Sequence, residues 1–214
     1  MVDGGRFDWE RHASRFPLLT APDDAHGGVV WTQTGKGLAS SLGRSSYLLK
    51  MRETLLRDLG PCLSPFNAFL LIQGLQTLPL RTRAHSDNAL VVSRFVSGHP
   101  KVSRVVHPSL ATGDEADRVA RYLNGGYGPL VFFELIGGRS MGARFVEALR
   151  LISHVTNRGD VRSYATHPAS TTHAQLPDAQ QLAAGVTQGG VRLAVGLEHP
   201  DDLLADLSQV SAIS

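Results

Sequence analysis

The apolar run that follows Ser64 and Pro65 limits the fold of this chain more than any other feature. Serine is a preferred N-cap, and proline suits the first helical position because its missing N–H would have no partner there. The segment FNAFLLIQGLQTL is then apolar on nearly every side, which predicts a helix buried on several sides. Pro79 should kink or break this helix. If the helical segments continue to Gly98, they are together long enough to bridge two lobes. An ordinary helix of a single core is an equally good interpretation.

Short strands and helices alternate in the part of the chain from Lys101 onward. Residues 1–45 are punctuated by glycine and proline too closely for a long helix. Thr112 and Glu115 have capping-box spacing, and apolar spacing defines the other elements. We expect helices at Tyr47–Leu59, 112–123 and Arg139–Ile152, a short helix near 178 and a last one from His199, with strands at Val102–Val106, Leu130–Ile136, Val161–His167 and around Arg192.

The composition excludes several classes of protein. The 214 residues are 42% apolar and 19% charged, which is typical of a globular chain. No run of about 18 apolar residues and no apolar signal core are present, so neither membrane insertion nor secretion is expected. A single cysteine, Cys62, fits a reducing cytoplasm. The net charge of +2, with scattered arginines, gives little support to nucleic-acid binding.

Arg192 is the first candidate for a ligand-binding residue. It lies on an expected strand beside a loop rich in serine and threonine, and a guanidinium presents a rigid fork to the two oxygens of a carboxylate. An exposed ion pair is the more ordinary use of such an arginine, and this alternative stays open. His167 and His173 are six residues apart, which is not a zinc spacing, so no metal site is predicted.

Six short stretches of the sequence are informative when they are taken together and in their order along the chain. They are GGRFDW, LRDLGPCLSPFNAFLLIQGLQTLPLR, RAHSDNAL, NRGD, HPASTTHAQL and VRLAVGLEHPDDLLADL. In this order they resemble the C-terminal half of the pyridoxal-phosphate (PLP) enzymes of cysteine and methionine metabolism. Within that family the chain is most similar to the O-acetylhomoserine sulfhydrylases, because Asn157 in NRGD stands where lyase and γ-synthase relatives usually have serine.

The resemblance implies an α/β (α+β) fold in two parts. Residues 1–63 would be the C-terminal tail of the large PLP-dependent-transferase domain, and residues 64–214 the small C-terminal domain, a mostly antiparallel sheet with helices on one face. The implied reaction replaces the acetate of O-acetylhomoserine by sulfide, giving homocysteine for methionine synthesis, with PLP as cofactor. The implied partners are an amino-acid substrate and either further copies of the chain, as in the family's tetramers, or a companion chain.

The same resemblance assigns roles to four residues. Arg192 would pair with the α-carboxylate of the substrate, and Asn157 would donate a hydrogen bond to it. Ser163 and Thr171 would line the same pocket. All four belong to substrate binding, and no catalytic residue is predicted in the chain.

The resemblance also implies that the Schiff-base lysine and most of the cofactor site precede the strand in which Met1 lies. Lys36, Lys50 and Lys101 do not occupy that lysine position. A PLP enzyme needs an amine to hold the cofactor, so this chain alone is not expected to catalyse the reaction. The alternatives are a non-catalytic amino-acid-binding module, a structural remnant, or another γ-family member of the cystathionine γ-synthase or lyase type.

Overall fold

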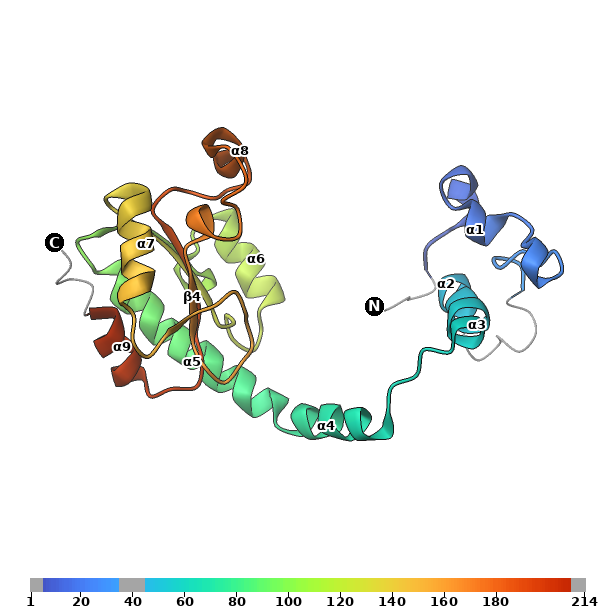
Figure 1. The fold of residues 1–214 in the computed structure, drawn as a ribbon, viewed down its shortest axis with the longest axis horizontal. Coiled ribbons are helices and arrows are strands. Elements are labelled where there is room, and N and C mark those ends of the chain that lie inside the picture. Colours follow the sequence, from blue (N-terminus) through green and yellow to red (C-terminus); the bar gives the residue numbers. More distant parts are fainter. Residues whose placement is uncertain (1–5, 35–44, 209–214) are drawn as a thin grey trace. The chain divides into compact units, whose positions relative to one another are not determined.

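The computed structural model describes residues 6–34 and 45–208. The chain divides into two compact units, residues 1–72 and 73–214, and each is described by itself (Figure 1). The expected boundary between residues 63 and 64 stays a prediction.

The first unit is built from short helical segments. In chain order these are the 3₁₀-helix Glu10–Arg15, α1 (Pro17–Thr20), the 3₁₀-helix Asp24–His26, α2 (Ser46–Lys50), the π-helical segment Met51–Leu56 and α3 (Arg57–Leu59). The last three follow one another without a break, which confirms the helix predicted over Tyr47–Leu59. Leu19 and Trp31 are the buried apolar side chains of this unit among the residues described.

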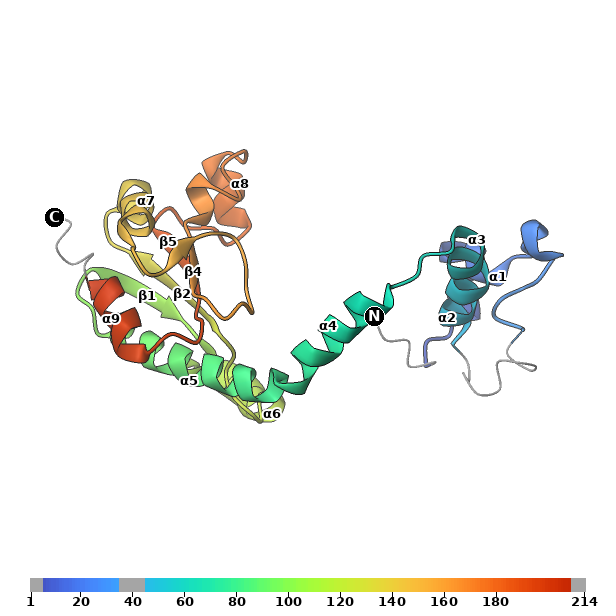
Figure 2. The same cartoon turned by 60° about the horizontal axis from the view of Figure 1, so that its bottom comes forward.

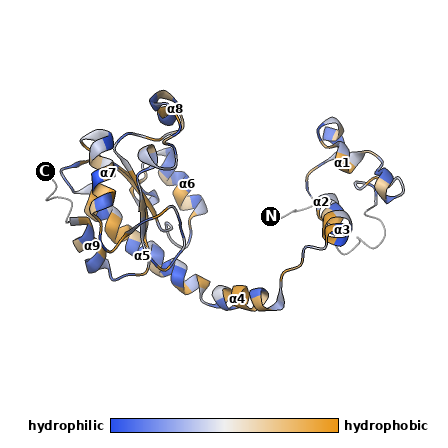
Figure 3. Ribbon diagram, in the orientation of Figure 1, coloured by the Kyte–Doolittle hydropathy of each residue, from blue (hydrophilic) through white to orange (hydrophobic). Residues whose placement is uncertain are grey.

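Helix α4 (Pro65–Gln76) begins as predicted, because Ser64 Oγ accepts a hydrogen bond from the Asn67 N–H at 3.1 Å. Thr77 leaves the helical conformation and separates α4 from α5 (Leu78–Ser97), with Pro79 in the first turn of α5. The predicted break is therefore confirmed. The predicted burial of α4 is wrong within this chain, since none of its residues is buried. The apolar residues of α4 (Figure 3) indicate a helix that packs against other apolar surface. The pattern does not indicate whether that surface belongs to the same chain or to another.

The second unit contains a five-stranded sheet in the order β1-β2-β5-β4-β3. All neighbouring strands are antiparallel except β3 and β4, which are parallel. The mostly antiparallel sheet is thus confirmed. Its strands are β1 (Val102–Val106), β2 (Leu130–Leu135), β3 (Ser153–His154), β4 (Tyr164–Thr166) and β5 (Gly190–Ala194).

Helices cover one face of this sheet, as predicted. The unit's helices after α5 are α6 (Asp114–Tyr122), α7 (Gly138–Ala148), α8 (Asp178–Ala183) and α9 (Pro200–Ser208), with 3₁₀ turns at Pro108–Leu110 and Pro168–Ser170. One apolar core joins α5, α7 and α9 to alternate residues of the strands, including Val131 and Phe133 on β2 and Val191 and Leu193 on β5. Helices α5 and α9 lie side by side in both views (Figures 1 and 2). Alternation along β5 therefore directs Arg192 to the face opposite this core.

Three details of the sequence prediction need correction. Gly113 is the N-cap of α6 and has φ of 56°, so the chain turns into the helix after Thr112, and the capping box does not form. Helix α7 ends at Ala148, short of Ile152. Strand β4 covers only the three residues Tyr164–Thr166 of the predicted strand Val161–His167, because residues 160–163 form a loop bonded to the segment that follows β5. The short strand β3 was not predicted. Within the described ranges, no helix is both long and apolar enough to cross a membrane.

Candidate functional site

Arg192 lies at the centre of the sheet face that the helices leave uncovered. It belongs to the middle strand, β5, and its cross-strand neighbours are Phe132 on β2 and Thr166 on β4. The residue is half-buried. Among the residues that the structure describes, none forms an ion pair or hydrogen bond with its guanidinium group. The ion pair considered from the sequence is therefore not seen among the described residues, and the role of Arg192 toward a ligand stays a prediction.

Asn157 follows the short strand β3 and is connected to Arg192 through the sheet. Thr166, the cross-strand neighbour of Arg192, donates its hydroxyl to the carbonyl of Val155 at 3.0 Å. Asn157 comes two residues later and is exposed. Its Oδ1 accepts the N–H of Arg158 at 2.8 Å, which leaves Nδ2, the donor end of the amide, without a hydrogen-bond partner among the described residues. The donor role of Asn157 toward a substrate stays a prediction.

Ser163 is fully buried and has partners inside the chain. Its hydroxyl donates to Glu198 Oε2 at 2.8 Å and accepts from the Gly196 N–H at 2.7 Å. The Ser163 N–H also donates to Glu198 Oε1 at 2.6 Å. A Cβ on Gly196 would lie 2.5 Å from the carbonyl oxygen of Val161, so only glycine permits this approach. Ser163 thus anchors the loop before β4 to the end of β5, and its contact with a substrate stays a prediction.

Thr171 is exposed at the end of the 3₁₀ turn Pro168–Ser170, and its hydroxyl donates to the His167 carbonyl at 2.8 Å. The His167 ring is fully buried: its Nε2 donates to the Gln188 carbonyl at 2.9 Å, and its Nδ1 bonds with Ser170 Oγ at 2.8 Å. Burial lowers the pKa of His167, so the ring is neutral at pH 7. The loop that carries Thr171 is therefore fixed at its base, and the role of Thr171 toward a ligand stays a prediction.

Gln181 on α8 fixes the rest of that loop, and it was not among the residues predicted from the sequence. This buried side chain directs its Nε2 at the carbonyls of Ala169, His173 and Leu176, at 3.3, 2.8 and 3.0 Å. Its Oε1 accepts from Gln188 Nε2 at 3.1 Å. A glutamine on a short helix gives no signal in a single sequence, because its partners are set by the path of the loop.

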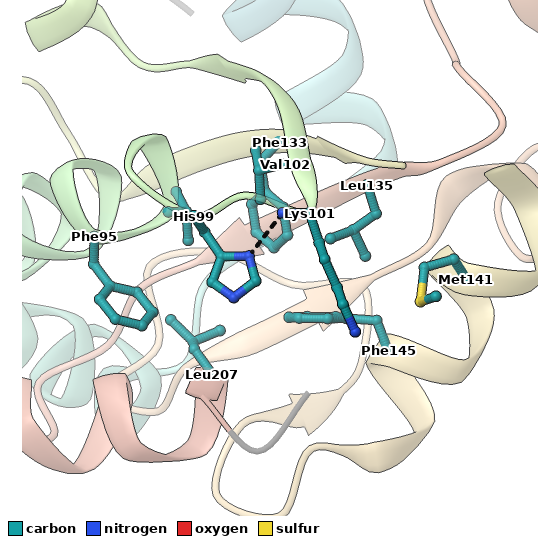
Figure 4. Close-up of a pocket in the computed structure, with 10 residues that line it drawn as sticks. Phe95, His99, Lys101, Val102, Phe133, Leu135, Met141, Phe145 and Leu207 are labelled. Carbon is teal, nitrogen blue, oxygen red and sulfur yellow. Dashed lines mark hydrogen bonds between the residues drawn. The ribbon is translucent and has the colours of Figure 1, made fainter. Parts of the chain in front are cut away.

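A small apolar pocket lies on the opposite side of the sheet, within the core. Its walls come from α5, β1, β2, α7 and α9, and the turn from His99 to Lys101 borders it (Figure 4). The Lys101 N–H donates to His99 Nδ1 at 3.2 Å. The volume open to a water-sized sphere is about 20 Å³, enough for one water molecule. The pocket is a packing gap and has no connection with Arg192. No cluster of metal-ligating side chains occurs among the described residues.

Comparison with known proteins gives consistent matches over nearly the whole chain. A family model described as Cys/Met metabolism PLP-dependent enzyme matches residues 20–211. An O-acetyl-L-homoserine sulfhydrylase from Leptospira meyeri is 44% identical over 98% of this chain and 47% of its own length. A homocysteine synthase from Schizosaccharomyces pombe is 39% identical over 100% of this chain and 48% of its own length. The chain spans about half the length of these curated relatives.

A solved structure supports the same relationship. The crystal structure of a putative O-acetylhomoserine (thiol)-lyase from Campylobacter jejuni, which contains a pyridoxyl-lysine phosphate group, matches with a TM-score of 0.77 and 35% identity. The match covers 92% of this chain and 45% of that one. The fold described above is therefore part of a larger known architecture.

Proposed function

The chain belongs to the Cys/Met metabolism PLP-dependent enzyme family, and from this premise we propose that it supplies the substrate-carboxylate site of an O-acetylhomoserine sulfhydrylase. The reaction of such an enzyme exchanges the acetate of O-acetylhomoserine for sulfide and yields homocysteine. The relatives named above support this choice of substrate over the other γ-family reactions.

The observation that carries the proposal is the unpaired guanidinium of Arg192. Burying part of a cation without a counter-ion costs free energy, and a half-buried arginine normally has an acidic partner. Arg192 has none among the described residues, and a bound α-carboxylate would supply one through two parallel hydrogen bonds. Asn157 Nδ2 offers an additional donor. Because Arg192 projects from the middle strand of a sheet, its backbone is held in place before the ligand arrives.

We infer that the described residues do not by themselves hold PLP. Lys50 donates from Nζ to Asp23 Oδ2 at 2.8 Å and lies over the Trp31 ring, so this amine already has a partner. Lys101 borders the apolar pocket within the core, which has room for about one water molecule and is too small for PLP. Lys36 lies outside the described residues. We infer that none of these lysines forms the Schiff base, and no catalytic step is assigned to the chain.

Calorimetry with O-acetyl-L-homoserine on the full chain tests the carboxylate site. The chain should bind the amino acid, and Arg192→Ala should weaken binding by about 2–3 kcal/mol, or roughly 30- to 150-fold, as expected for a charge-assisted pair. Arg104→Ala is the matched control, since it removes an exposed strand arginine from β1 of the same sheet. Equal affinities for Arg192→Ala and the unsubstituted chain would refute the proposal.

Borohydride reduction in the presence of equimolar PLP tests the inference about the lysines. Mass spectrometry should find Lys36, Lys50 and Lys101 without a phosphopyridoxyl group. Stoichiometric modification of any one of them would show that this chain carries its own cofactor lysine.

We further propose that the chain works in association with other chains, either copies of itself or a companion. The support is α4, whose large apolar side chains are more than half exposed within this chain, from 52% for Leu70 to 67% for Phe66. Exposed apolar area of this kind on a helix is typical of a surface covered by a partner.

A further inference from the structure

The ring of Tyr164 lies on the same face of the sheet as Arg192, beside Ala194, which follows Arg192 by two residues on β5. In the pairing of β4 with β5, Tyr164 is opposite Ala194 and Thr166 is opposite Arg192. Tyr164 is only 6% exposed although this face is free of the core helices. The small Ala194 leaves room for a large ring at this point, and Arg162 lies over the ring at 6.0 Å. The tyrosine is therefore held between β5 and the loop that precedes β4.

The Tyr164 hydroxyl closes that loop through Asp160. It donates to Asp160 Oδ2 at 2.8 Å, and Asp160 Oδ1 accepts the Arg162 N–H at 3.2 Å. These bonds lower the pKa of Asp160, so its carboxylate remains charged and the hydroxyl bond is charge-assisted. Farther along, the Leu197 N–H donates to the Val161 carbonyl at 2.8 Å. The loop is thus attached, on the C-terminal side of Asp160, to the segment that follows β5.

Asn157 precedes Asp160 by three residues, and the segment between them has few other attachments. Residues 155–159 are all exposed. On the N-terminal side of Asn157, the Thr166 hydroxyl bonds to the Val155 carbonyl at 3.0 Å and to the Thr156 hydroxyl at 3.5 Å, next to Arg192. On the C-terminal side, the bond between Asp160 and Tyr164 is the first side-chain attachment to the sheet. The place of Asn157 relative to Arg192 therefore depends on the Thr166 bonds before it and on the Tyr164 bond after it.

We propose that Tyr164 is a positioning residue that, through Asp160, holds Asn157 at the distance from Arg192 that an amino-acid carboxylate requires. This inference rests on the proposed function of Arg192 and Asn157. Tyr164 itself does not contact the ligand. Its hydroxyl orders the loop in advance, so that binding does not have to order it.

Calorimetry with O-acetyl-L-homoserine on the full chain tests this role. Tyr164→Phe keeps the ring and removes only the hydroxyl, and it should weaken binding about tenfold, the factor supplied by roughly 1.4 kcal/mol. Tyr122→Phe is the matched control: Tyr122 also lies beside an arginine, Arg121, but on α6 and 67% exposed. It should bind as the unsubstituted chain does.

A double-mutant cycle separates positioning from a general loss of stability. In the Asn157→Ala background, Tyr164→Phe should cause no further loss of affinity, because the group that it positions is gone. Independent, multiplying losses would overturn the inference, as would an unchanged affinity for Tyr164→Phe alone. The proposed function is refuted, and this inference with it, if Arg192→Ala binds as well as the unsubstituted chain. The same holds if the unsubstituted chain does not bind O-acetyl-L-homoserine at all.

Discussion

Replacing Asp206 with alanine tests how α9 supports the segment that leads to the candidate site. The carboxylate is 2% exposed and accepts three consecutive backbone N–H groups, from Arg150, Leu151 and Ile152, at 2.9, 3.0 and 2.9 Å. This cluster joins α9 to the chain between α7 and β3. Losing the bonds from the two exposed residues, Arg150 and Leu151, should cost about 1 kcal/mol each, because water can replace the acceptor. The N–H of Ile152 is buried, and leaving it unpaired should cost roughly 1–3 kcal/mol.

The sum is a destabilisation of the second unit by about 4 kcal/mol, which lowers the urea midpoint by about 2 M for a typical slope of about 2 kcal/mol per M. Both tryptophans, Trp9 and Trp31, belong to the first unit, so hydrogen exchange of β2 and β5 peptides against urea is the suitable assay. Asp202→Ala, an exposed carboxylate on the same helix, should cost only about 0.3–1 kcal/mol. Equal losses for Asp206→Ala and Asp202→Ala would refute the reasoning.

Three further outcomes are expected. Gly142→Ala should destabilise the second unit by about 2 kcal/mol, because its Cβ would lie 2.5 Å from the buried His167 ring. The control is Gly74→Ala on α4, where the added Cβ would have open space around it. This substitution should be neutral or stabilising in the same urea assay. Burial lowers the pKa of His167 and His107. The free energy of unfolding should therefore be greatest above about pH 6.5 and should fall below that pH, where the unfolded chain takes up protons that the folded chain does not. If the free energy of unfolding depends on pH in the same way in His167→Asn and His107→Asn, this explanation is wrong. The full chain should associate in light scattering, and Phe69→Glu should raise the monomer fraction; a monodisperse unsubstituted monomer would count against association.

Local signals predicted several features of the fold. Ser64 and Pro65 start α4 as their chemistry indicates, because an N-cap involves only the next few residues. Arg192 lies on a strand, as predicted, and the resemblance indicated the sheet and its covered face. The helix at 112–123 was also found, although Thr112 does not cap it, since Gly113 redirects the backbone at that point.

The interactions that hold the candidate site together were not predictable in the same way. Glu198 is bonded to Ser163, 35 residues earlier, and Asp206 to backbone groups more than 50 residues earlier. Gln181 acts on a loop whose path only the folded chain defines. A single sequence shows each of these as an ordinary polar residue on or near a helix. The parallel pair β3–β4 was missed for a related reason, since two residues are too few to give a periodic pattern.

The position of Gln181 in the chain has a consequence for the order of folding. Its side chain bonds to the carbonyls of Ala169, His173 and Leu176, all of which are synthesised before it. The loop that carries Thr171 therefore cannot settle into its final conformation until α8 has formed and docked against it. Contacts within α5 and α7 are local and need no such wait. In a refolding experiment this loop should accordingly gain its protection late, after the helices that support the sheet.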